Sequence, residues 1–222
     1  MRRKILHYCG KMLSLFRTRR PRSRIFGLDR GTPIDRIYIE KFLRENQARI
    51  RGTILEVGDD TYTKALAAPE SKSKILLFKG ESSPQHILGD LTKPETLPKD
   101  SIDCFICTQT LNFIFDLPTA LEGIRHLLKP GGCALITAAG LSQISRFDYA
   151  RWGDYWRFTD MSLRKLLASV FGEQNVEVKT YGNFRAAAEF LNGRAAEELT
   201  QKELDATDPD YQMIITAVAV KR

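Results

Sequence analysis

The chain has 222 residues, with 34 lysines and arginines against 27 aspartates and glutamates and a formal net charge of +7. This length suits about one to one and a half domains, which excludes a small disulfide-stapled scaffold and a large multidomain enzyme. Hydrophobic residues make up 43% of the chain and charged residues 27%, so we expect a folded core and exclude general disorder. No stretch reaches the roughly 18 consecutive apolar residues of a membrane-spanning helix.

The positive charge is concentrated at the N-terminus. Residues 1–30 contain ten basic residues and one acidic residue, whereas the other 192 residues carry a net charge of −2. We therefore divide the chain into a basic N-terminal arm, residues 1–30, and a folded domain, residues 31–222. Residues 5–16 place apolar side chains at helical spacing, with Lys4 and Lys11 next to them, a pattern typical of a short basic helix on an anionic membrane surface or on a partner. A basic tail without a partner is the alternative.

The arm does not resemble a secretory signal. Its apolar stretch is interrupted by His7, Gly10 and Lys11, and no small-residue cleavage site follows. The chain has four scattered cysteines, which do not form a disulfide framework and favour a reducing compartment. We expect a cytoplasmic protein, either free or peripheral at the inner face of the membrane.

From Pro33 onward, helical patterns and short apolar runs alternate. The first helix is expected from Pro33 to about Gly52. Strands are expected at residues 53–57, 74–78, 86–88, 102–108, 133–137, 176–180 and 212–220, and further helices at 62–68, 117–128, 162–171 and 186–198. This alternation indicates a parallel sheet with helices on both faces. Only a helix-like insertion and the polar stretch 207–209 separate the last two strands, so we expect the final strand to be antiparallel. The predicted fold class is α/β, with a Rossmann-like, seven-stranded, mostly parallel sheet.

Ligands of open α/β sheets bind at the carboxyl ends of the strands, so the residues after each strand are the candidates for a site. Glu56 and Gly58 end the first strand, Gly89 and Asp90 follow the third, and residues 108–111 follow the fourth. A helix then leads to a Lys-Pro-Gly-Gly stretch before the next strand. The first turn lacks the Gly-x-Gly-x-x-Gly spacing, and no Gly-Lys-Ser/Thr loop occurs, which disfavours nicotinamide cofactors and phosphate-loop nucleotides.

Taken in order, these motifs resemble the class I S-adenosylmethionine-dependent methyltransferases, and within them the small bacterial type 11 group. The resemblance covers residues 31–222 and implies S-adenosylmethionine as the cofactor. It places Glu56 and Gly58 at the methionine part and Asp90, with Leu91 beside it, at the adenine. The floor of the pocket would be formed by Thr108, Gln109, Thr110 and Leu111.

Two positions depart from the family pattern. Asp60 and Tyr62 stand where the family has glycines, so their side chains narrow the backbone approach, although Asp60 can attract the ammonium group of the cofactor. The ribose hydroxyls normally meet an acidic residue at the end of the second strand. Here Lys79 and Gly80 come first, and Glu81 is the nearest carboxylate.

The acceptor site of the family usually begins after the fifth strand. In this chain that segment, residues 142–159, contains both tryptophans and several charged side chains, which suits a polyhydroxylated acceptor. Its stretch 152–159 and residues 31–36 also look like a subgroup found in glycan contexts. A hydroxyl acceptor benefits from a base, for which Asp154 is our first candidate and Asp148 the second. The predicted acceptor contacts are Tyr149, Trp152, Tyr155 and Arg157. The alternative is that the tryptophans only pin a loop over the sheet.

The histidines and cysteines suggest no further chemistry. None of the three histidines follows a strand, so we interpret them as structural. Cys104 and Cys107 lie three apart in one strand and face opposite sides, so we expect neither a shared metal nor a disulfide.

The sequence thus favours an S-adenosylmethionine-dependent enzyme that methylates an oxygen of a sugar, glycan or similar small acceptor. One alternative is a noncatalytic or weakly cofactor-binding interaction protein with the same fold. Another is a nucleic-acid methyltransferase that uses the basic arm, which the near-neutral domain disfavours.

Overall fold

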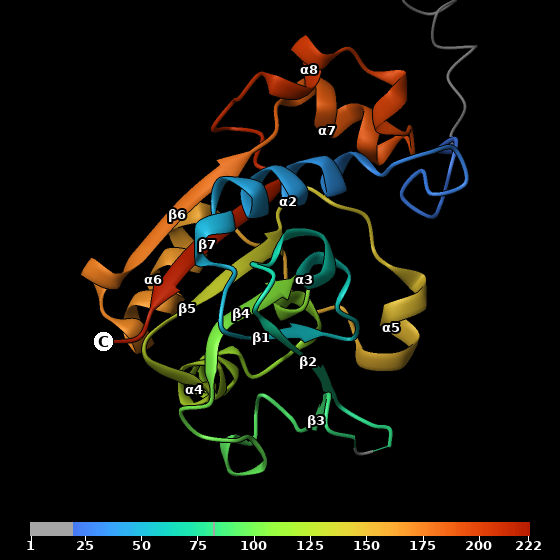
Figure 1. Ribbon diagram of the computed structural model, residues 1–222. Coiled ribbons are helices and arrows are strands. Elements are labelled where there is room, and N and C mark those ends of the chain that lie inside the picture. Colours follow the sequence, from blue (N-terminus) through green and yellow to red (C-terminus); the bar gives the residue numbers. More distant parts are fainter. Residues whose placement is uncertain (1–19, 82) are drawn as a thin grey trace, which may run out of the picture.

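The computed structural model describes residues 20–81 and 83–222. Its seven-stranded sheet has the order β3-β2-β1-β4-β5-β7-β6, and helices cover both faces (Figure 1). The strands from β3 to β5 are parallel, whereas β7 runs antiparallel to β5 and β6. The predicted fold class and the antiparallel last strand are therefore confirmed.

The predicted strands and helices occur in the expected order. The strands are β1 (Thr53–Val57), β2 (Lys72–Leu77), β3 (His86–Leu88), β4 (Ile102–Thr108), β5 (Leu128–Ala139), β6 (Val176–Tyr181) and β7 (Ile214–Val220). The helices are α2 (Ile34–Glu45), α3 (Thr61–Leu66), α4 (Leu117–Leu127), α5 (Arg146–Trp152), α6 (Asp160–Phe171), α7 (Phe184–Leu191) and α8 (Gln201–Asp205). The first predicted helix, α2, ends at Glu45 instead of near Gly52, and two short helices, α5 and α8, were not predicted. β5 begins at Leu128 instead of residue 133, because a register shift opposite Ile102 and Cys104 accommodates the Lys-Pro-Gly-Gly stretch.

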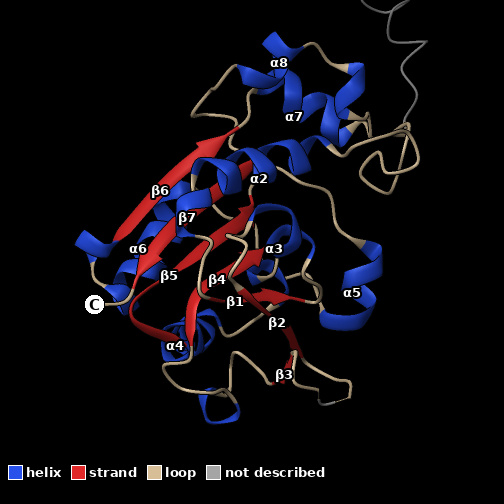
Figure 2. Ribbon diagram, in the orientation of Figure 1, coloured by secondary structure: helices blue, strands red, loops and turns tan. Residues whose placement is uncertain are grey.

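A hydrophobic core lies on each face of the sheet, between the strands and the helices that Figure 2 shows on either side. α4 and α6 cover one face, and α2 and α7 cover the other. Because successive side chains of a strand alternate, Phe105 of β4 joins the first core, whereas Cys104 and Ile106 join the second. This double burial explains the continuous apolar runs of the central strands and leaves their carboxyl ends as the place for a site.

The helix expected over residues 186–198 is wrong in its second half. α7 ends at Leu191, and Gly193 turns the chain with a φ of +76°, a conformation that favours glycine. A Cβ at Gly193 would lie 2.3 Å from the carbonyl oxygen of Ser23. Only glycine therefore lets the N-terminal segment pack this closely against the turn. The chain then forms a short 3-10 helix, Ala196–Glu198.

Residues 20–30, the described part of the expected arm, lie against the domain. The ring of Phe26 is 5.9 Å from that of Phe190, and the Arg30 guanidinium donates two hydrogen bonds of 2.8 Å to Glu198. The predicted amphipathic pattern at residues 5–16 falls outside the described residues. In the part of the chain that is described, no helix has the length and apolar character to cross a membrane.

Candidate active site

The larger cavity of the site has a volume of about 670 Å³ and lies at the carboxyl ends of β1, β2 and β4 and just beyond β3. Loop residues 113–116 and side chains from α5 close its outer side. Its lining is mostly apolar, with Asp90, Asp116 and Asp148 among its few charged groups. Such a concave, largely apolar cavity with a few placed polar groups is typical of a small-molecule site.

The turn after β1 leaves the backbone open to this cavity. Gly58 has a φ of +83°, and a Cβ built on it would meet no atom within 4 Å. Glu56 is buried, and its two carboxylate oxygens accept hydrogen bonds from the backbone of Tyr62 and Thr63 at 3.2 and 2.9 Å. Burial raises the pKa of the Glu56 carboxyl, and this effect outweighs the hydrogen bonds, which lower it. Glu56 therefore fixes the start of α3, while Gly58 leaves room for a ligand.

A smaller cavity of about 260 Å³ adjoins the first, and both are lined by Val57 and Gln109. Charged side chains line it, namely Asp35 and Arg36 from the start of α2, together with Glu56 and Asp59. Desolvation raises the pKa of the Asp35 carboxyl to about 6. Carboxylates and a guanidinium in one small cavity match a zwitterion, such as the amino-acid end of a ligand.

Gln109 stands where the two cavities meet and carries an unsatisfied donor. Its φ is +48°, unusual for a residue other than glycine, and its backbone N–H donates to the Thr137 carbonyl at 2.9 Å. Its side-chain Nε2 is buried without a hydrogen-bond partner. Because an unpaired buried donor is costly, this atom fits a ligand that spans both cavities.

Most of the predicted cofactor residues meet at these cavities. Those on the larger cavity are Gly58, Asp90, Leu91, Gln109 and Thr110, and those on the smaller one are Glu56, Thr108 and Gln109. One oxygen of Asp90 accepts from the backbone and hydroxyl of Thr92, at 2.9 and 2.7 Å, which leaves the other for a ligand.

Two predicted cofactor residues, Asp60 and Glu81, line neither cavity. The Asp60 carboxylate pairs with Lys64 at 2.7 Å and accepts from Ser73 at 3.1 Å, and the Lys64 hydrogen bond lowers its pKa. Glu81 is exposed, and Lys79 lines the larger cavity at the end of β2 instead. The structure thus shows no acidic residue of β2 at the larger cavity.

The predicted acceptor residues divide into two groups. Asp148, Trp152 and Tyr155 line the larger cavity, whereas Tyr149 is exposed on α5 outside it. Asp154 and Arg157 do not line either cavity of the site, because they form an ion pair that closes the loop after α5.

Both tryptophans hold this loop, and Trp152 also lines the larger cavity. Trp152 contacts the ring of Phe78 edge-on at 5.7 Å. Trp156 donates its indole N–H to the Ile114 carbonyl at 3.0 Å and stacks on Phe115 at 5.9 Å. These contacts hold the loop after α5 over the sheet, as the alternative interpretation predicted, and Trp152 also forms part of the cavity wall.

Sequence reasoning missed several residues of the site. Phe115 and Asp116 lie only a few residues after Leu111, the last residue of the predicted pocket floor, so their position in the sequence could have indicated them. Asp35 and Arg36 belong to a stretch that carried the family resemblance, but their role depends on where the start of α2 lies in space. No sequence signal indicated Phe78 or Lys79 beyond their position at a strand end.

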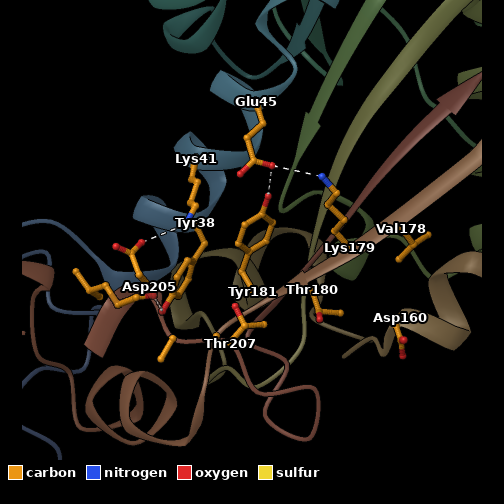
Figure 3. Close-up of a pocket in the computed structure, with 13 residues that line it drawn as sticks. Tyr38, Lys41, Glu45, Asp160, Val178, Lys179, Thr180, Tyr181, Asp205 and Thr207 are labelled. Atoms are coloured by element: carbon orange, nitrogen blue, oxygen red, sulfur yellow. Dashed lines mark hydrogen bonds and ion pairs between the residues drawn. The ribbon is translucent and has the colours of Figure 1, made fainter. Parts of the chain in front are cut away.

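A separate cavity of about 450 Å³ lies between α2, β6 and α8 (Figure 3). Tyr181 donates to Glu45 at 2.8 Å, Lys179 pairs with the same carboxylate at 3.6 Å, and Lys41 pairs with Asp205 at 3.1 Å. These charged groups satisfy one another, so we assign no ligand to this cavity.

The histidines and cysteines of the described chain take structural positions. His86 and His126 each bond a backbone carbonyl, of Glu81 and Leu97. Cys104 and Cys107 lie in opposite cores, as their spacing predicted. Within residues 20–81 and 83–222, no three His, Cys, Asp or Glu side chains cluster as metal ligands would.

Comparison with known proteins agrees with this geometry. The family model of the methyltransferase domain matches residues 48–136. A SAM-dependent methyltransferase from Archaeoglobus fulgidus aligns with a TM-score of 0.54 and 13% identity, over 84% of this chain and 94% of that one. One from Mesorhizobium loti aligns with 0.51 and 17% identity, over 84% and 97%. The N-methyltransferase NodS from Bradyrhizobium japonicum, solved with S-adenosyl-L-homocysteine, aligns with 0.53 and 14%, over 86% and 89%. No curated protein matches the chain.

The solved structures are too distant in sequence to show more than the fold. The family model assigns a methyltransferase domain to residues 48–136, and the sheet order and the solved structures show the fold of class I S-adenosylmethionine-dependent methyltransferases. S-adenosylmethionine is its cofactor, and the two joined cavities fit it. The larger cavity suits the adenosine and the smaller, charged one suits the amino-acid end. The unpaired Gln109 donor lies between them.

Proposed function

We propose that the protein methylates an oxygen of a sugar, a glycan or another small hydroxylated acceptor. The observation that carries this proposal is an aromatic rim on the larger cavity. The Phe115 ring lies 5.4 Å from Tyr155 and 5.9 Å from Trp156, and all three rings are exposed. Exposed ring faces stack on the apolar faces of sugars, while Asp116 and Asp148 nearby in the cavity can accept hydrogen bonds from hydroxyls.

Asp148 is the proposed base. Methyl transfer to a hydroxyl forms a carbon–oxygen bond, breaks a carbon–sulfur bond and leaves a proton to be removed. Asp148 lines the cavity and accepts a 2.6 Å hydrogen bond from Ser145 Oγ, which orients its carboxylate. Asp154, the first sequence candidate, has both oxygens bonded to Arg157 and cannot approach an acceptor without breaking that pair.

Methylation of a panel of hydroxylated, amine and thiol acceptors, followed by release of S-adenosyl-L-homocysteine, tests the proposal. Hydroxylated acceptors should be methylated, and Asp148→Asn should lower kcat by about a hundredfold while leaving S-adenosyl-L-homocysteine binding unchanged. Tyr155→Ala should raise KM for the acceptor. Phe184→Ala, which removes an exposed ring on α7, is the matched control. Methylation of amines or thiols alone would contradict the proposal.

The second candidate is a noncatalytic or weakly binding member of the class, and the position of Tyr62 favours it. Its side chain lines the smaller cavity where the family has a glycine, and its backbone N–H is held by Glu56. Calorimetry with S-adenosyl-L-homocysteine separates the two candidates. Absence of heat at millimolar ligand would contradict the enzyme proposal and support the noncatalytic candidate.

A further inference from the structure

α5 is a helix without a buried face. None of its residues is buried, and Phe147 and Tyr149 are 65% and 53% exposed. Ile144, just before the helix, is 44% exposed. A helix of a globular protein normally buries an apolar stripe against the core, so this one leaves apolar surface for another partner.

The N-terminal segment continues this surface. Gln143 donates its side-chain amide to the Arg24 carbonyl at 2.8 Å, which ties the start of α5 to residues 20–30. Ile25 and Leu28 of that segment are 52% and 57% exposed. Figure 1 shows α5 and the blue N-terminal loop on the same side of the molecule.

Arginines are interspersed with these apolar side chains. The Arg151 guanidinium lies 3.5 Å from the centre of the Phe147 ring, and that of Arg146 lies 5.8 Å from Tyr149. Arg22 and Arg24 are exposed on the N-terminal segment. The sequence of residues 1–19, which precedes them, has six basic residues and no acidic one. The surface is therefore both apolar and cationic.

We propose that this surface docks on an anionic lipid bilayer. We define the docking surface by its apolar members, Ile25, Leu28, Ile144 and Phe147, and its basic members, Arg146 and Arg151. Aromatic and aliphatic side chains enter the headgroup boundary, while arginines attract anionic headgroups. The aliphatic side chains cannot stack on nucleobases, which favours a bilayer over a nucleic acid.

Docking in this way places the cavity beside the membrane. Trp152 belongs to α5 and lines the larger cavity, so this cavity lies next to the headgroup layer when α5 is docked. An acceptor carried on a lipid then reaches the site without leaving the bilayer. This consequence for the acceptor rests on the proposed function, whereas binding to the bilayer does not.

Flotation of the full chain with vesicles, without cofactor or acceptor, tests docking. The chain should bind vesicles of phosphatidylcholine mixed with phosphatidylglycerol, lose binding as salt increases, and ignore phosphatidylcholine alone. The double variant Ile25→Glu/Phe147→Glu should weaken binding by about tenfold or more, and Arg151→Glu by about fivefold. Phe184→Glu on α7 and Arg125→Glu on α4, both exposed and outside the docking surface, are the matched controls.

Three results would overturn the proposal. Equal binding to both vesicle types would exclude charge recognition, and surface variants that bind like their controls would assign binding to residues 1–19 alone. Binding of a labelled RNA by a chain that ignores vesicles, weakened by the same variants, would make this a nucleic-acid surface.

A second measurement needs no substitution. The two tryptophans, Trp152 and Trp156, lie in or beside α5, so lipids brominated near the headgroup should quench their fluorescence in the unmodified chain. Vesicle binding without quenching would also contradict docking through α5. Circular dichroism and binding of S-adenosyl-L-homocysteine check that each variant is folded.

Discussion

Arg157 holds the carboxylate of Asp154 through both oxygens, with Nη1–Oδ1 and Nη2–Oδ2 distances of 2.5 and 2.9 Å. The backbone N–H of Ser145 donates to the same carboxylate at 3.3 Å, and the Asp154 side chain is 1% exposed. This pair therefore joins the residue before α5 to the loop after it. The position of α5, and with it of Asp148 and Trp152 in the cavity, depends on the pair.

Substitution of Asp154 should act first on stability. Asp154→Ala removes one partner of a buried ion pair and should lower the free energy of unfolding by about 3 kcal/mol, measured by urea denaturation. Glu177→Ala, at an exposed site of β6, should change it by less than about 0.5 kcal/mol. A variant with unchanged stability but no methyl transfer would instead make Asp154 the base.

Replacement of Lys79 by an acid should strengthen cofactor binding. Lys79 lines the larger cavity at the strand end where the family resemblance places the ribose acid. Lys79→Glu supplies charge-assisted acceptors for the ribose hydroxyls and should raise affinity for S-adenosyl-L-homocysteine about tenfold in calorimetry. Glu81→Gln, at an exposed residue outside the cavity, should have no effect. If Glu81→Gln instead lost affinity for S-adenosyl-L-homocysteine, Glu81 would be the ribose contact, as the sequence predicted.

The fold could be predicted because each central strand is buried on both faces. Ile102–Thr108 forms a continuous apolar run, and its bounds were predicted without error. Helix ends were harder where a long-range contact decides them. α7 stops at Leu191 because Gly193 must turn tightly against the backbone of Ser23, and nothing local to residues 186–198 reveals that neighbour.

The site was predicted where its residues follow strands in sequence, and missed where it depends on the path of distant segments. Gly58, Asp90 and Gln109 lie at strand ends and line the larger cavity. Asp60 also follows a strand, but α3 begins directly after it and its carboxylate pairs with Lys64, away from the cavities. Asp35 enters the site only because α2 starts beside β1, which sequence spacing does not show.

The raised pKa of Asp35 predicts a pH dependence of stability and of cofactor binding. Desolvation raises its pKa from 3.8 to about 6, so the protonated form is favoured in the folded protein. Its contribution to stability is complete below about pH 4 and is lost as the pH rises to about 6. Thermal unfolding of the wild type should therefore lose stability over that window relative to Asp35→Asn.

Cofactor affinity should move in the opposite direction. Ionised Asp35 attracts the ammonium of S-adenosyl-L-homocysteine, so affinity should rise as the pH increases through about 6 and be lower and flatter in Asp35→Asn. Calorimetry across this range measures both chains. Identical pH profiles would show that the smaller cavity does not hold the ammonium.

Replacement of Gln109 should weaken cofactor binding without lowering the stability of the ligand-free protein. Gln109→Leu removes the buried, unpartnered Nε2, so the free energy of unfolding without ligand should stay equal or rise. Loss of the donor should at the same time lower affinity for S-adenosyl-L-homocysteine about tenfold. A variant that loses stability but keeps its affinity would show that the side chain is structural.

Two deletions locate the boundary of the domain. From the sequence alone, removal of residues 1–30 should leave cofactor binding intact, but Phe26 and Leu28 line the smaller cavity and Phe26 contacts Phe190. We propose residue 20 as the boundary.

Deletion of residues 1–19 should leave affinity for S-adenosyl-L-homocysteine within about twofold of the full chain. Deletion of residues 1–30 should lower the Tm by about 5 °C or more and weaken binding, because it exposes Phe190 and removes one wall of the cavity. If both deletions bound S-adenosyl-L-homocysteine equally well, the boundary would lie at residue 30, as the sequence predicted.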